Sequence, residues 1–146
     1  NTHAQIDTHL AATSAHGVTG NLMGFGDIRS KIITATRDLS AATGDVAYTG
    51  AGFTPTSLIC LANLEGGRVA MGIVDSAKTG KAVELDFDGN WYSNLANANG
   101  MVYYQTGGST NQIAIVKTFD ADGFTLTWTK TGSPTGTIRL SFLCIR

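Results

Sequence analysis

The stretch IAIVKTFDADGFTLTWTKTG, residues 113–132, decides the fold class. Apolar and β-branched residues fill both halves, and the turn-forming DADG lies between them, which is the pattern of a β-hairpin. Gly123 supplies the turn, because glycine adopts backbone conformations that other residues avoid. Phe124, Leu126 and Trp128 alternate with threonine, so we expect their side chains in a core or at an interface between chains.

Similar strand-like segments follow one another from about residue 31 to the end of the sequence. They are KIITATRDL, DVAYTGAGF, FTPTSLICLANL, GGRVAMGIVDS, KAVELDFD and GTIRLSFLCIR. Together with shorter runs in the Asn-rich middle, they amount to about eight to ten short strands spaced by about ten residues. No helical pattern long enough for a βαβ unit interrupts them. The sequence therefore predicts an all-β fold, an antiparallel β-sandwich.

Two of these segments carry a further expectation. The Glu-Gly-Gly sequence at 65–67 separates two apolar runs, so we expect a hairpin between them. In the last segment Leu143 and Ile145 add apolar residues to the otherwise polar side of the strand. This end of the strand is therefore predicted to be buried on both faces.

The composition limits the classes of function. The chain has 146 residues, enough for one domain with a single core, and a net charge of −1. Its lysines and arginines are spread thinly, so it lacks the clustered positive charge that nucleic-acid binding needs. No apolar run approaches the roughly 20 residues of a membrane-inserted helix. Only 14% of the residues are charged, which suits a chain that buries surface against its own copies, because interface cores are depleted in charge.

The first sixteen residues differ from the rest of the chain. His3, Ile6, Leu10 and Thr13 are spaced by three, four and three positions, which is the rhythm of a coiled coil. A helix this short is stable in water only when it packs against copies of itself or against a partner. We therefore expect these residues to form an oligomeric stalk.

The segment AHGVTGN, residues 15–21, ends this helical pattern, since its two glycines favour the termination of a helix. It lies between the stalk and the first strand. We therefore expect an N-terminal stalk, attachment segment and linker in residues 1–30 and a β-sandwich head domain in residues 31–146.

The helical lead, SAHGVTGN (14–21) and the β domain together resemble a bacteriophage fibre or spike protein. YTGAGFTPTSLICLAN (48–63) and DADGFTLTWTKTGSPTGTIRLSFLCIR (120–146) resemble the C-terminal receptor-binding or decorating domains of tailed-phage structural proteins. They also resemble the small sandwich of H-type lectins, which assemble as trimers.

This resemblance implies a homotrimer located in the virion, with the N-terminal segment attached to other virion proteins. The head would bind a glycan or protein on the host surface, or it would decorate the capsid. A stand-alone lectin-like binding module is the alternative from a different class.

The residues that carry chemistry do not form an enzyme motif. All three histidines, His3, His9 and His16, precede the β domain, and no GxSxG nucleophile motif is present. One histidine per chain on a threefold axis is a conceivable metal site, but a position in the seam or on the surface is the favoured interpretation. We expect no enzymatic activity, no cofactor and no metal.

Acidic residues and cysteines have structural explanations. Glu84, Asp86 and Asp88 alternate along one strand, which is typical of a solvated strand face next to a turn. Cys60 and Cys144 lie in apolar runs, so buried free thiols are the favoured interpretation. A disulfide between them stays open, because it requires their two strands to be neighbours.

Aromatic and amide side chains in the middle of the chain are the candidates for ligand binding, since such side chains are what a saccharide or a protein surface would meet. The candidate residues are Trp91, Tyr92, Asn94, Asn97, Tyr103, Tyr104 and Gln105. The alternative is that Trp91 and one of the two tyrosines fill the core while the asparagines form turns.

Overall fold

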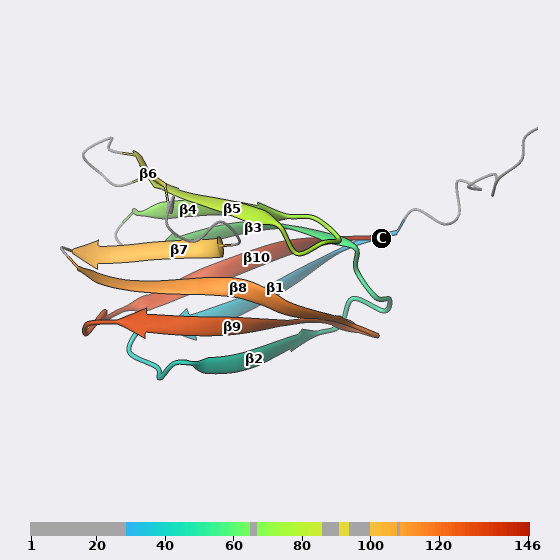
Figure 1. The fold of residues 1–146 in the computed structure, drawn as a ribbon, viewed down its shortest axis with the longest axis horizontal. Coiled ribbons are helices and arrows are strands. Elements are labelled where there is room, and N and C mark those ends of the chain that lie inside the picture. Colours follow the sequence, from blue (N-terminus) through green and yellow to red (C-terminus); the bar gives the residue numbers. More distant parts are fainter. Residues whose placement is uncertain (1–28, 65–66, 86–90, 94–99, 108) are drawn as a thin grey trace, which may run out of the picture.

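The computed structural model describes residues 29–64, 67–85, 91–93, 100–107 and 109–146. These residues form ten strands and no helix (Figure 1). The strands are β1 Ser30–Asp38, β2 Gly44–Thr49, β3 Ser57–Leu64, β4 Val69–Val74, β5 Gly80–Leu85, β6 Trp91–Ser93, β7 Gly100–Gly107, β8 Thr110–Asp120, β9 Gly123–Thr131 and β10 Thr137–Ile145. Each strand-like segment of the sequence forms a strand, so the predicted all-β fold is confirmed.

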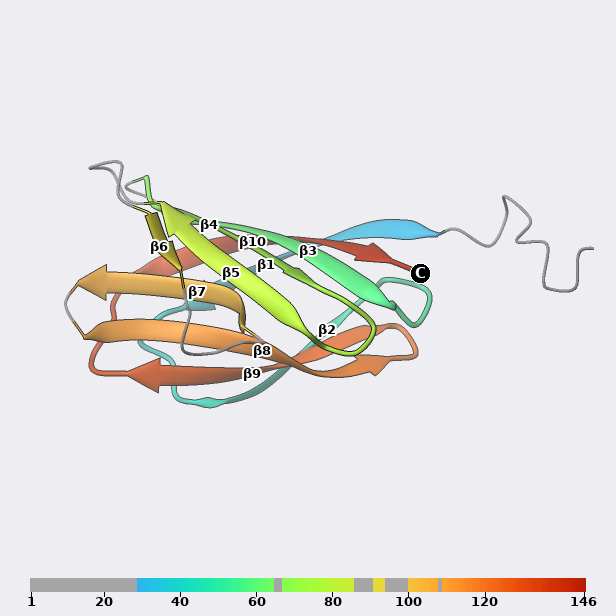
Figure 2. The same cartoon turned by 45° about the horizontal axis from the view of Figure 1, so that its top comes forward.

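The strands form two antiparallel sheets that lie face to face (Figures 1 and 2). The order is β1-β10-β3-β4-β5-β6 in the six-stranded sheet and β2-β9-β8-β7 in the four-stranded sheet. The expected hairpins are present, since β3 pairs with β4 and β8 pairs with β9. Gly123 has a φ of 148°, and an added Cβ would lie 2.0 Å from the Tyr48 carbonyl oxygen, so this turn requires glycine. The architecture is an antiparallel β-sandwich.

The core lies between the two sheets and is centred on aromatic rings. Phe124, Leu126 and Trp128 are fully buried, so they belong to the core of the single chain and not to an interface. The ring of Phe124 lies 5.2 Å from that of Tyr48 and 4.9 Å from that of Phe142, both within the range of favourable aromatic pairs. The Tyr48 hydroxyl accepts a hydrogen bond of 3.1 Å from the Trp128 indole nitrogen, which satisfies both polar groups inside the core.

Polar side chains connect the sheets on the side where β1 and β2 lie. The Arg37 guanidinium donates a hydrogen bond of 3.1 Å to the Gln112 side-chain oxygen and lies 5.0 Å from the centre of a Trp128 ring. The Gln112 amide nitrogen in turn donates to the carbonyl oxygens of Leu39 and Ala41 at 2.7 and 2.9 Å. The buried amide thus fixes the chain segment that passes from one sheet to the other.

On the opposite side, β7 lies directly against the six-stranded sheet. It contacts both β4 and β5, and the carbonyl group of Met101 faces Gly72. A Cβ atom at position 72 would lie 1.7 Å from the Met101 carbonyl oxygen, so only glycine permits this approach. Gly72 therefore determines how closely the two sheets approach on this side.

We predict that Gly72→Ala destabilises the protein, because the methyl group requires a shift of the β7 backbone. The expected loss in the free energy of unfolding is about 2 kcal/mol or more, as in overpacked cores. Gly44→Ala is the matched control, since nothing lies within 4 Å of the position of its Cβ. Urea unfolding of both variants tests this prediction, and equal midpoints would contradict it.

The two cysteines are buried and free, as the favoured interpretation of the sequence predicted. Their strands are neighbours, because Cys60 of β3 is paired with Phe142 of β10, two residues from Cys144. Burial raises the pKa of the Cys144 thiol to about 11 and also raises the pKa of Cys60. Both thiols therefore remain protonated at pH values at which exposed cysteines ionise.

This burial predicts slow thiol chemistry and a loss of stability in alkali. Unfolded thiols ionise near their ordinary pKa of 9.0 while the buried thiols stay protonated, so the free energy of unfolding falls as the pH rises above that value. At pH 8, a thiol reagent should react with the native protein much more slowly than with protein in denaturant. Equal rates in the two conditions would show that the thiols are accessible. In the variant Cys60→Ala, the alkaline decline in stability should be smaller.

Candidate interaction face

The outer face of the six-stranded sheet is apolar in its centre. The pairing register places Ile32, Leu143, Ile59 and Ile73 side by side on β1, β10, β3 and β4. Within the described residues, six of the seven exposed large hydrophobic side chains lie on this face. They are Ile32, Ile59, Leu61, Val69, Met71 and Ile73, and we refer to them as the apolar face.

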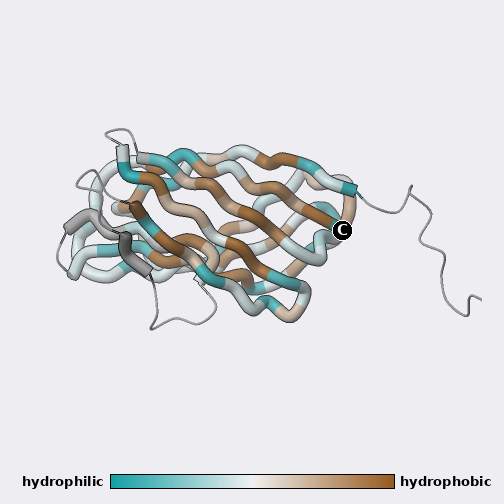
Figure 3. The backbone as a smooth tube through the Cα atoms, turned by 90° about the horizontal axis from the view of Figure 1, so that it is seen from above, coloured by the Kyte–Doolittle hydropathy of each residue, from teal (hydrophilic) through white to brown (hydrophobic). Residues whose placement is uncertain are grey.

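The side chains of the apolar face are exposed to an extent that is unusual for their type. Ile32 is 61% exposed, Ile73 55% and Leu61 53%. Figure 3 looks onto this sheet and shows hydrophobic residues on neighbouring strands. A contiguous patch of this kind differs from single scattered hydrophobic residues, because it marks an interaction site in most soluble proteins.

The apolar face is also hollowed. One depression of about 210 Å³ is lined by Ile32, Ile59, Leu61, Ser141 and Leu143. A second, of about 150 Å³, lies on the β4–β5 side and is lined by Met71, Gly72, Ile73, Lys81 and Val83. The hollows can accept side chains from a partner surface.

Among the described residues, the charged side chains on this side of the sandwich lie around the apolar face. Lys81 ends the central row on β5, and Asp75 follows β4 at the same end of the sheet. At the other end of the sheet, Asp38 and Arg139 lie on β1 and β10. Small polar residues also lie on this face, namely Thr34, Thr36, Ser57, Asn63 and Ser141, whereas Lys81 is paired directly with Ile73. The face therefore has an apolar centre and a polar, nearly neutral rim.

The last strand differs from its prediction. Leu143 and Ile145 were expected to make β10 buried on both faces, but within the single chain both side chains are half-buried. The reason is that the four-stranded sheet covers only the inner face, where Ile138, Leu140 and Phe142 are fully buried. The outer side chains of β10 instead adjoin the apolar face.

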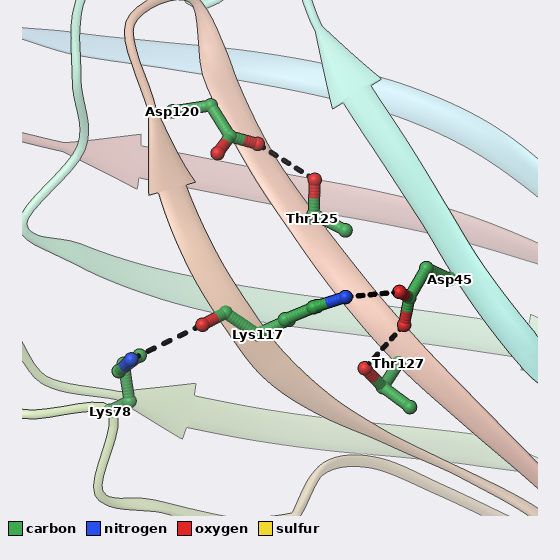
Figure 4. Close-up of polar contacts among 6 residues, drawn as sticks. All are labelled: Asp45, Lys78, Lys117, Asp120, Thr125 and Thr127. Atoms are coloured by element: carbon green, nitrogen blue, oxygen red, sulfur yellow. Dashed lines mark hydrogen bonds and ion pairs between the residues drawn. The ribbon is translucent and has the colours of Figure 1, made fainter.

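The outer face of the four-stranded sheet is polar and forms its own hydrogen bonds (Figure 4). Lys117 forms an ion pair with Asp45, whose other oxygen accepts a hydrogen bond of 2.6 Å from the Thr127 hydroxyl. The hydrogen bonds from Lys117 and then Thr127 hold the pKa of Asp45 below its usual value. Thr125 donates to Asp120 at 2.8 Å. The two outer faces of the sandwich therefore have opposite chemical character.

Glu84 does not lie on a solvated strand face, so that prediction is wrong. Its side chain is fully buried on the inner side of β5, beneath β7, and it forms an ion pair of 3.3 Å with Arg68. The positive charge of Arg68 stabilises the buried carboxylate. Asp86 and Asp88 lie outside the described residues.

The predicted ligand-binding residues are only partly described. Trp91 and Tyr92 lie on β6, and Tyr103 and Gln105 lie on β7, at the edges of the two sheets. Tyr104 is fully buried, and its hydroxyl donates to the Arg68 carbonyl oxygen at 3.5 Å, so this tyrosine belongs to the core. Two groups of predicted residues lie outside the described part of the chain: Asn94 and Asn97, and the stalk residues His3, Ile6, Leu10 and Thr13.

The sequence contains a signal for the apolar face that the strand prediction did not use. In SLICLANL and VAMGIV, apolar residues occupy both sides of the strand. Such runs are typical of strands with two buried faces. In this chain one side faces the core, and the other side faces outward.

The described residues contain no group of three or more His, Cys, Asp or Glu side chains that could hold a metal ion. In the same part of the chain, no helix has the length and hydropathy that a membrane crossing requires. Comparison with protein-family models, with curated proteins and with solved structures finds no match.

The buried ion pair gives a testable prediction. Arg68→Met should leave the Glu84 carboxylate buried without this cation, and we expect a loss of about 1–3 kcal/mol in the free energy of unfolding, since Arg68 is partly exposed. Arg68→Lys is the control, because it keeps the positive charge. Thermal unfolding at pH 7 measures both variants, and an unchanged midpoint for Arg68→Met would show that the pair does not stabilise the fold.

Proposed function

We propose that the protein is a non-enzymatic structural component of a tailed-bacteriophage virion, a homotrimeric fibre or spike that displays its β-sandwich head. The observation that supports this proposal is the apolar face on one side of a sandwich whose other side is polar. A contiguous exposed apolar patch with a polar rim is typical of a surface that contacts a partner, so it favours an assembly component.

Burial of the apolar face would supply part of the free energy of assembly. Complete burial of a Val, Leu, Ile or Met side chain contributes about 1.5–3 kcal/mol, so completing the burial of a half-exposed one contributes about 1 kcal/mol. The six side chains of the apolar face thus offer roughly 6 kcal/mol per chain on contact with a partner. Association costs about 4–15 kcal/mol in lost freedom of motion, so further contacts from the rim and from the stalk are required.

The proposed role of the head is recognition of a glycan or protein on the host surface. The residues proposed for this contact are in the aromatic and Asn-rich stretch at 91–105, without the buried Tyr104, and the strands β6 and β7 of this stretch lie at the edges of the two sheets. The polar outer face of the four-stranded sheet would then remain exposed to solvent.

Decoration of a capsid shell is a second candidate function. The apolar face favours it as well, because a broad apolar sheet face can dock onto a shell formed by other proteins. The two functions differ in the expected behaviour of the purified chain. A fibre head associates with its own copies, whereas a shell-bound protein remains monomeric in the absence of the shell.

We predict that the purified full chain forms a stable trimer, with a solution mass three times the 15.3 kDa of one chain. Light scattering coupled to gel filtration, repeated over a hundredfold range of concentration, measures this mass. A folded monomer at every concentration would contradict the trimeric fibre and favour a solitary binding module or a shell-bound protein.

A further inference from the structure

We propose that the apolar face is the surface through which one copy of this chain packs against other copies. This inference rests on the proposed function, and it names both the surface and its partner. The occupant is a second copy of the chain, and the contact is formed by the outer face of the six-stranded sheet.

The distribution of charge favours a copy of the same chain. Apart from Lys81 at the β5 end, the central rows contain aliphatic, methionine, threonine and serine side chains, so a nucleic acid or a strongly charged peptide finds no cluster of complementary charge there. Within the part of the chain that the structure describes, each end of the face has one acidic and one basic residue, Asp38 with Arg139 and Asp75 with Lys81. Two copies therefore meet without an excess of like charge.

The size and layout of the face agree with an interface between chains. Five strands spaced by about 4.8 Å and six residues of about 3.4 Å each give a centre of roughly 20 Å by 20 Å. A stable contact buries about 800 Å² per partner. The apolar centre supplies about half of this area, and the surrounding serine, threonine and asparagine side chains can supply the rest, as the polar rim of an interface does.

The threefold symmetry of a trimer also determines which parts of the apolar face contact each other. A closed ring of three copies needs a heterologous contact, in which two different surfaces of each chain meet. The apolar face contains two such surfaces on either side of β3. One is formed by Ile32 and Leu143 on β1 and β10, and the other by Met71, Ile73 and the hollow above Gly72 on β4 and β5.

We infer that the β1–β10 side of one copy packs against the β4–β5 side of the next. Ile32 is the most exposed of the large hydrophobic side chains that the structure describes, and it lies on an edge strand, so it can project into a neighbouring hollow. In this arrangement β3, which lies between the two surfaces, faces the threefold axis. The polar face of the four-stranded sheet points away from the axis.

A pair of matched substitutions tests the surface. Leu61→Glu places a carboxylate in the centre of the apolar face, and Ile115→Glu places one at an exposed isoleucine on the opposite outer face of the sandwich. We expect Leu61→Glu to raise the dissociation constant of the trimer at least about a hundredfold, because the contact would bury an unpaired charge. Ile115→Glu should leave this constant unchanged. Light scattering gives the mass, and circular dichroism shows that each variant is folded.

The outcomes separate the two proposals. A trimeric wild-type chain whose Leu61→Glu variant remains trimeric would overturn the surface assignment and leave the trimeric fibre standing. A monomeric wild-type chain would contradict the fibre itself. If Leu61→Glu fails to fold, the milder Leu61→Gln is measured at the same position, with Ile115→Gln as its control.

Cross-linking tests the heterologous contact. Thr34→Cys on β1 and Lys81→Cys on β5 introduce exposed thiols on the two sides of the face, and the native thiols are buried. With a short bis-maleimide, the double variant should give a covalent trimer in denaturing gels, whereas each single variant should not. A double variant that stops at the covalent dimer would indicate a twofold contact and overturn the threefold arrangement.

Discussion

The pairing of β10 with both β1 and β3 is the constraint on which the rest of the structure depends. It brings together segments from opposite ends of the described chain, so that Ile32, Leu143 and Ile59 lie in one cross-strand row. On the inner side, the same strand places Phe142 against the rings of Tyr48 and Phe124. One strand therefore builds both the core and the centre of the apolar face, which is why its sequence is apolar on both sides near its end.

The residues that were predicted correctly are those whose environment is set by local sequence. The β8–β9 hairpin follows from alternation around Gly123, and the buried free thiols follow from apolar runs around Cys60 and Cys144. The burial of Glu84 could not be predicted from the local sequence. It depends on contact between β5 and β7, and these two strands are separated by a long segment of sequence. The apolar face was also not predicted. A strand with apolar residues on both sides has the same sequence pattern whether its second face is covered by the same chain or by a partner.

The two outer faces of the sandwich show how composition relates to assembly. The face of the four-stranded sheet satisfies its polar groups internally, as the contacts among Asp45, Lys117 and Thr127 illustrate. The centre of the outer face of the six-stranded sheet instead contains aliphatic and methionine side chains that are exposed in the single chain. The charged residues are therefore distributed unevenly between the two outer faces. In the proposed assembly, this difference places the apolar face inward and the polar face outward.

The topology also implies that each chain folds before it assembles. Ile32 joins the apolar face only when β1 has paired with β10, and this long-range pairing is slow to form compared with the hairpins. A chain with β10 unpaired would expose the edge of β3 together with its apolar side chains, which is a state prone to incorrect association. An N-terminal stalk that holds three chains together would raise their effective concentration, so that completed faces meet their own copies first. In the proposed assembly the stalk and the apolar face therefore act together. The stalk holds three copies close to one another, so that the exposed sheet face of each copy contacts another copy and not an incorrect partner.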